Sequence, residues 1–127
     1  MKHTFIAVKK QNIEIAKSHF KNTGIKPYKF CSLDDKFVLY EKDDKLVICE
    51  LFKNIDVFHQ NFSNKSTILD YWGITIIPPH TSFEIKHRIK SNSHLKFKII
   101  ISKEFRKFVN LLDYAIKNEY YIVHLGI

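Results

Sequence analysis

The sequence has few of the residues that build linkers, disulfide frameworks or phosphate-binding loops. Its 127 residues include three glycines, three prolines and two cysteines. So short a chain, with so little linker material, fits one globular domain over residues 1–127 that buries one core. Cys31 and Cys49 are too few for a disulfide scaffold and lack zinc-ligand spacing, so we expect two reduced thiols.

Long apolar runs are also missing. No run approaches the ~20 residues that a membrane-spanning helix needs, and the apolar stretch Phe5–Val8 is too short for a signal peptide. We therefore expect a cytoplasmic protein without a membrane partner. Apolar residues still make up 45% of the chain, which is typical of a folded domain rather than a disordered one.

Arginine is scarce although the chain is basic. The net charge is +8, but Arg88 and Arg106 are the only arginines, and arginine is the residue that binds phosphate bidentately. The lysines are scattered, and the joint excess of Lys, Ile, Asn and Phe is what an AT-rich genome produces. This pattern favours a solvated, lysine-rich surface, so we expect no specific nucleic-acid partner.

The stretch Leu69–Pro79 organises the expected fold. Gly73 permits backbone angles that other residues avoid, and the β-branched residues 74–77 suit a strand buried on both faces. Pro78 and Pro79 cannot donate to a ladder and end it. The other expected strands are Thr4–Lys9, Tyr28–Cys31, Lys36–Glu41, Lys45–Phe52, Leu95–Ile101 and Tyr120–Leu125.

Helices are expected between these strands. The first runs from Asn12 to Thr23 and stops at Gly24; a short one covers Asn54–Phe62; a third is capped within His80–Ser82 and ends near Lys90. Ser102 caps the strongest, Lys103–Asn118.

The order of these elements predicts an α+β (mixed α/β) fold, with a mixed sheet of about five to seven strands and about three or four helices. Leu95–Ile101 and Tyr120–Leu125 are expected to be parallel neighbours, since a helix crosses over between them.

No stretch of the sequence carries a recognisable catalytic or metal-binding motif. His80, His87 and His94 recur every seven residues, but no zinc-type spacing or nucleophile elbow occurs. A ribonuclease-like pairing of His87 or His124 with a lysine stays open, because such sites assemble in space. We expect no catalytic residue, metal, cofactor or small-molecule ligand, and surface or core histidines are the favoured interpretation.

The residues Tyr71–Pro79, followed by Ser82 and Phe83, resemble a segment of small bacterial immunity proteins encoded beside polymorphic or contact-dependent inhibition toxins. The resemblance implies a cytosolic, non-enzymatic protein that binds and neutralises a cognate toxin domain. Many immunity proteins are acidic, so the basic charge is a departure that implies a neutral or acidic contact face on the toxin. The alternative is a small basic nucleic-acid-binding protein or ribonuclease-like effector.

Partner contact would use a few large anchors. Tyr71 and Trp72 lie beside a glycine turn, and with Arg88 they belong to the residue types that dominate binding energy at protein interfaces. Trp72 as a core residue is an equally good interpretation of the sequence alone. We therefore take Tyr71, Trp72 and Arg88 as the candidate partner-binding residues.

The first prediction concerns the thiols. Protein purified and denatured without reductant should yield both Cys31 and Cys49 as free thiols in an Ellman assay, because a reducing compartment and a two-cysteine chain disfavour a disulfide. Recovery of no free thiol would contradict the expected cytosolic, disulfide-free domain.

Overall fold

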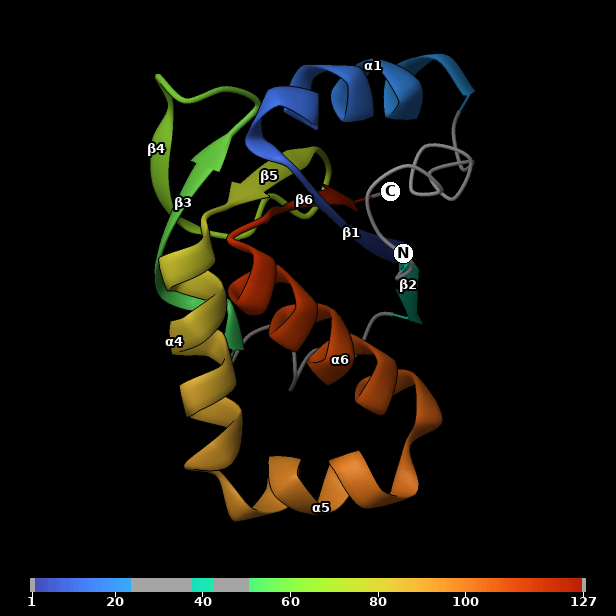
Figure 1. The fold of residues 1–127 in the computed structure, drawn as a ribbon, viewed down its shortest axis with the longest axis vertical. Helices are drawn as coiled ribbons and strands as arrows, with labels where there is room; N and C mark the ends of the chain where they lie inside the picture. Colours follow the sequence, from blue (N-terminus) through green and yellow to red (C-terminus); the bar gives the residue numbers. More distant parts are fainter. Residues whose placement is uncertain (1, 24–37, 43–50, 127) are drawn as a thin grey trace.

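Six strands pair into one sheet in the computed structural model, which describes residues 2–23, 38–42 and 51–126 (Figure 1). The strands are β1 (Lys2–Val8), β2 (Val38–Lys42), β3 (Lys53–His59), β4 (Lys65–Ile68), β5 (Ile74–Ile77) and β6 (Tyr121–Gly126). The helices are α1 (Ile13–Thr23), which follows a 3-10 turn at Lys10–Asn12, and α4 (Pro79–Lys90), α5 (Ser93–Ile101) and α6 (Lys103–Asn118).

The strand order across the sheet is β2-β1-β6-β5-β3-β4, and every described pair is antiparallel. The first strand thus lies beside the last, with Phe5 opposite His124. The expected α+β class, the six strands and the covering helices agree with the sequence prediction. Every ladder among the described strands is antiparallel, so the expected parallel pairing is not found there.

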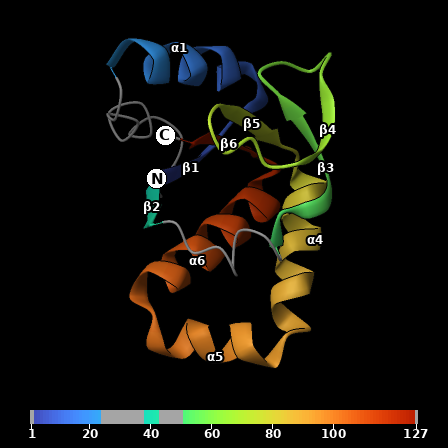
Figure 2. The same ribbon diagram turned by 180° about the vertical axis from the view of Figure 1, so that it is seen from behind.

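Helices cover both faces of the sheet. Figure 1 and Figure 2 show α1 on one side, α4 and α6 on the other, and α5 across the far ends of α4 and α6. Alternate residues of β1 serve the two layers: Phe5 and Ala7 join the core under α4 and α6, whereas Ile6 and Val8 pack with Ile13 of α1. A strand covered on both sides needs a continuous apolar run rather than alternation.

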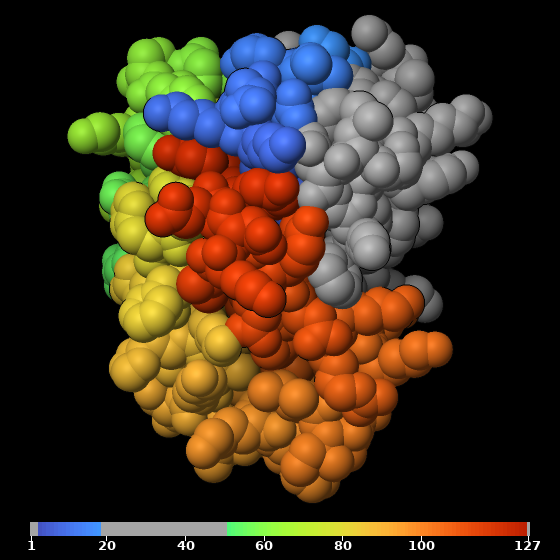
Figure 3. All heavy atoms as spheres, in the orientation of Figure 1, coloured from blue at the N-terminus to red at the C-terminus, as the bar shows by residue number. Residues whose placement is uncertain are grey.

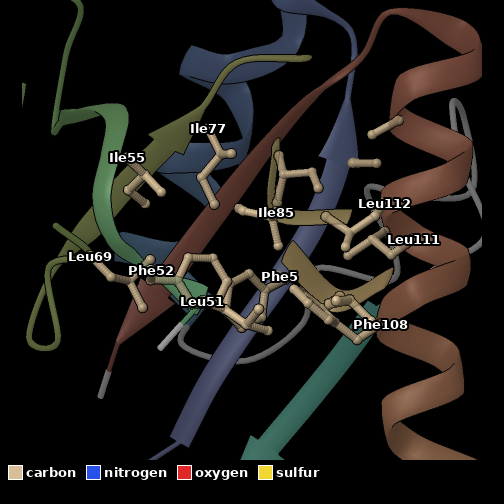
Figure 4. Packing of buried hydrophobic residues seen from close by; sticks show 14 of the residues in the cluster. Phe5, Leu51, Phe52, Ile55, Leu69, Ile77, Ile85, Phe108, Leu111 and Leu112 are labelled. Carbon is tan, nitrogen blue, oxygen red and sulfur yellow. The ribbon is translucent and has the colours of Figure 1, made fainter. Parts of the chain in front are cut away.

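The larger core is built around stacked and tilted phenylalanine rings. Phe5 lies 5.5 Å from Phe52 and 5.3 Å from Phe108 between ring centroids. Aliphatic side chains from α4 and α6, such as Ile85 and Leu112, close around them (Figure 4). Burial of these side chains is the main force that holds the helices on the sheet.

Several expected elements are confirmed. The helix Lys103–Asn118 has the predicted bounds, and the Ser102 hydroxyl accepts a hydrogen bond from the Phe105 amide at 3.2 Å. The strands near Thr4–Lys9 and Tyr120–Leu125, the strand after Gly73 and the helix Asn12–Thr23 are also present. The helix that ends at Lys90 is also present, but its expected cap within His80–Ser82 is wrong: it starts at Pro79, a residue that suits the first helical position, and has no side-chain cap.

Two expected elements are wrong. Asn54–Phe62 was predicted as a helix, but most of it is β3, in which Ile55 and Val57 alternate into the core. Leu95–Ile101 was predicted as a strand parallel to Tyr120–Leu125, but it is α5. The Asn92 side chain caps α5 by accepting hydrogen bonds from the amides of the second and third residues after it, and this cap favours the helical periodicity.

Other expectations fall on residues outside the described ranges. These are the stop at Gly24, the strand Tyr28–Cys31, both cysteines and most of the strand Lys45–Phe52. Leu51 and Phe52, the described end of that last segment, do not belong to a strand. The expected Lys36–Glu41 strand corresponds to β2, which pairs with β1.

The second prediction concerns the core. Phe108→Ala should lower the free energy of unfolding by about 3–5 kcal/mol, since it removes a fully buried ring and leaves a cavity. The same substitution at Phe83, whose side chain on α4 is 62% exposed, should change stability by less than about 0.5 kcal/mol. Urea unfolding followed by circular dichroism measures both, and equal losses would contradict the assigned core.

Candidate functional site

The loop between β4 and β5 is fixed in shape by its own hydrogen bonds. The Asp70 amide donates to the Thr75 hydroxyl at 2.8 Å, and the Asp70 carboxylate accepts from the Trp72 amide at 3.0 Å. The Gly126 amide donates to the Gly73 carbonyl at 2.9 Å and ties the loop to β6. The loop is therefore attached both to β5, through Thr75, and to β6, through Gly126.

Two glycines allow this close packing. A Cβ atom on Gly126 would overlap the Tyr71 carbonyl, and one on Gly73 would overlap the Asp70 carboxylate. The backbone of Gly73 is not left-handed, so the conformational reason expected from the sequence is wrong. Gly73 instead leaves room for the Asp70 carboxylate, and Gly126 is the glycine at a close backbone approach.

The loop borders a hollow of about 640 Å³. Phe52 and Leu69 are its buried part, whereas Trp72 is 76% exposed and Ile68 is 55% exposed. Its lining is completed by Lys53, His59, Asp70 and Tyr71. A large, mainly apolar hollow with a few polar groups is the usual form of a binding site.

Tyr71 and Trp72, two of the sequence candidates, come together at this hollow. The Tyr71 ring is half-buried and meets the His3 ring edge-on, with centroids 5.6 Å apart. Trp72 exposes its large apolar side chain to solvent, whereas Leu69 and Tyr71 of the same loop pack into or against the core. Of the two interpretations that the sequence allowed for Trp72, the core one is wrong.

Arg88, the third candidate, makes several hydrogen bonds within the protein. Its guanidinium donates to the carbonyls of Lys53 at 2.5 Å and Asn54 at 3.0 Å, and to the Glu84 carboxylate at 2.8 Å. These bonds join α4 to the start of β3, where Asn54 has a positive φ of 53°. Arg88 lines a second hollow of about 370 Å³ that shares Lys53 with the first. Arg88 thus holds in place the backbone of Lys53, the residue that lines both hollows.

Sequence reasoning missed the strand residues of the site. His59 and Ile68 reach the hollow from β3 and β4, and the His59 imidazole is 2.7 Å from the Ile68 carbonyl. The Asn- and Ser-rich stretch 60–64 between two short segments is a hairpin signal that would have placed these strands side by side. The helix assignment over Asn54–Phe62 hid it.

Two histidines form a buried pair beside the loop. His3 Nδ1 and His124 Nε2 lie 2.8 Å apart, and both side chains are fully buried. Desolvation first, and then the neighbouring imidazoles of His3 and His59, lower the pKa of His124 well below the usual value of 6.5. His124 is therefore neutral, and its hydrogen bond goes to His3 rather than to a lysine.

The remaining histidines are dispersed. His80 is 2.8 Å from the Asp56 carboxylate, and His87 and His94 are exposed on α4 and α5. Across residues 2–23, 38–42 and 51–126, no three His, Cys, Asp or Glu side chains are placed to hold a metal ion. Among the same residues, no helix is long and apolar enough to cross a membrane.

Comparisons with known proteins identify no relative: no family model, curated protein or solved structure matches the chain.

The third prediction concerns pH. Since the folded state holds His124 neutral and the unfolded chain protonates it below about pH 6.5, the unfolded state binds more protons in acid. Stability should fall as pH drops below about 6.5, by up to about 1.4 kcal/mol per pH unit for this one group.

Urea unfolding at a series of pH values tests this dependence. In His124→Gln the free energy of unfolding should fall less steeply as the pH is lowered. The matched change His87→Gln, at an exposed histidine, should leave this pH dependence unchanged. If the free energy of unfolding falls equally steeply at low pH in the wild type and in His124→Gln, His124 does not cause the loss of stability in acid.

Proposed function

We propose that this protein is a bacterial immunity protein that binds a cognate toxin domain in the cytosol and neutralises it by stoichiometric contact, without turnover. The observation that carries the proposal is the 76% exposure of Trp72 on a fixed loop at the edge of the larger of the two hollows. The Tyr71–Pro79 segment that resembles immunity proteins forms this same loop and the strand after it.

An exposed tryptophan of this kind is costly unless it has a partner. Trp72 and Ile68 place apolar surface in water next to the hollow, and contiguous surface of this type marks interaction sites. The backbone bonds that fix the loop reduce the entropy that binding would otherwise lose. Trp72 thus has the residue type, position and rigidity of an interface anchor.

The toxin surface that fits here is apolar at its centre and neutral or acidic at its edge. Phe52, Leu69 and Tyr71 offer apolar contacts inside the hollow, and Lys53 supplies a cation at the border with the second hollow. A protein with a net charge of +8 attracts such a surface at long range.

The nucleic-acid alternative receives less support from this site. A groove for nucleic acid needs a row of cations along the phosphate backbone. Lys53 is the one lysine or arginine among the residues that line the larger hollow.

The fourth prediction tests the proposal with the toxin domain encoded beside this gene. Trp72→Ala should weaken binding by about 2 kcal/mol or more in calorimetric titration, because it removes an anchor, while the melting temperature stays nearly unchanged. Phe83→Ala, at another exposed aromatic residue, on α4, is the matched control and should bind as the wild type does.

Arg88→Ala should act differently. It leaves the carbonyls of Lys53 and Asn54 without their donor, so it should lower the melting temperature together with the affinity. Protection of the toxin's target should saturate near equimolar protein. Full protection at strongly substoichiometric amounts would overturn the binding mechanism, and no binding to the neighbouring toxin would overturn the proposed function.

A further inference from the structure

Helix α5 is apolar on two opposite sides. Leu95 is buried and Ile99 packs against the same core, so these two residues face α4 and α6. On the outward side Phe97 is 57%, Ile100 71% and Ile101 66% exposed. Soluble surface helices carry polar residues outward, and an apolar outer side indicates that something covers it.

The outward residues form one continuous stripe. At 3.6 residues per turn, Phe97, Ile100 and Ile101 fall at i, i+3 and i+4 and share one side of the helix. The preceding turn continues that side with the exposed polar residues Ser93 and His94. By the same geometry Lys96 and Lys98 fall on opposite flanks of the stripe, so cations border it on both sides.

The end of the molecule around α5 is strongly basic. Between Glu84 and Asp113 the chain holds a single acidic residue, Glu104. The cations next to α5 in this stretch are Lys90, Lys96, Lys98, Lys103, Arg106 and Lys107. Arg106 donates to the carbonyls of Ile99 and Ile100, at 3.0 and 2.7 Å, which fixes its positive charge at the last turn of α5. Such an excess repels a second copy of this end and attracts an anionic surface.

Shape distinguishes a membrane from a grooved protein partner. α5 lies across the ends of α4 and α6 and forms the extremity of the molecule in both ribbon views (Figure 1, Figure 2). In the space-filling view the same end is formed by α5 and the adjoining turns (Figure 3). A helix in this position can lie along a flat surface over its whole length.

We propose that the outer side of α5, Phe97, Ile100 and Ile101 with its flanking lysines, docks on the surface of an anionic lipid bilayer. Phe and Ile enter the headgroup–acyl boundary, and the lysine ammonium groups stay at the level of the lipid phosphates, as in other amphipathic surface helices. The expectation of no membrane partner rested on the lack of a spanning segment, which a surface helix does not need. The inference is independent of the toxin-binding proposal.

Vesicle flotation of the full chain tests it. The protein should float with phosphatidylcholine vesicles that contain phosphatidylglycerol, and about tenfold less with phosphatidylcholine alone, because several cations face the surface. Binding should fall as salt rises. Lys96→Gln with Lys103→Gln should weaken binding about tenfold or more.

The apolar part has its own variants. Phe97→Ser with Ile101→Ser should abolish flotation while circular dichroism and the melting temperature stay unchanged, since both side chains are exposed. Phe83→Ser, at an exposed apolar residue in the first half of α4, is the matched control and should float as the wild type does.

Three results would overturn the proposal. One is no flotation with phosphatidylglycerol vesicles, and another is full flotation of the double serine variant. The third is a dimer in size-exclusion chromatography that the double serine variant converts to monomer, because a second copy would then cover the stripe.

Discussion

The antiparallel ladder between β1 and β6 is the contact on which the other elements depend. It joins the first described strand to the last and places both in the interior of the sheet, and the side chains of His3 and His124, 121 residues apart in the sequence, meet across it. β2 and β5 add to its two sides, α1 covers one face, and α4 and α6 cover the other. Both hydrophobic clusters include residues of β1 and β6, so neither can form without this ladder. We therefore expect the domain to unfold cooperatively.

The same two strands bury two histidine side chains, and their desolvation lowers the stability of the fold. Imidazole rings at positions 3 and 124 occupy places where aliphatic side chains would fill the sheet without desolvating polar atoms. Nδ1 of His124 is buried with no hydrogen-bond partner among the described residues. Natural proteins keep such groups where a specific arrangement matters more than stability. Here the His3 ring supports Tyr71, so the pair helps to set the shape of the candidate site.

The sequence predicted elements well where several local signals agreed. For Lys103–Asn118, the Ser102 cap and a long apolar stripe pointed to one helix, and its bounds are as predicted. Leu95–Ile101 failed because its apolar residues fit both a period of two and a helical turn. The segment over β3 failed for the same reason, since the spacing of Ile55, Phe58 and Phe62 imitates a helical stripe. Whether a short apolar segment forms a helix or a strand depends on the elements that it packs against.

The candidate site was predictable only in part, for a related reason. Tyr71 and Trp72 stood out because they adjoin a glycine in a chain that has few glycines. The residues opposite them, His59 and Ile68, come from β3 and β4, and the short polar stretch 60–64 that indicates a hairpin between these strands lay partly inside the expected helix Asn54–Phe62. Arg88 has the residue type of an anchor, but its donors are used on backbone carbonyls, a fact that exists only in three dimensions.

In the β4–β5 loop, the residues that fix the backbone conformation differ from the residues whose side chains are exposed for binding. Shape comes from backbone amides, the Asp70 and Thr75 side chains, and the room that Gly73 and Gly126 leave. Chemistry comes from side chains that point away from those contacts, Trp72 above all. Substitutions at Trp72 or Ile68 can therefore alter what the surface recognises while the fold stays intact. Single substitutions at these positions can therefore change the partner that the loop binds, whereas any side chain at Gly126 would collide with the Tyr71 backbone and displace the loop from the sheet.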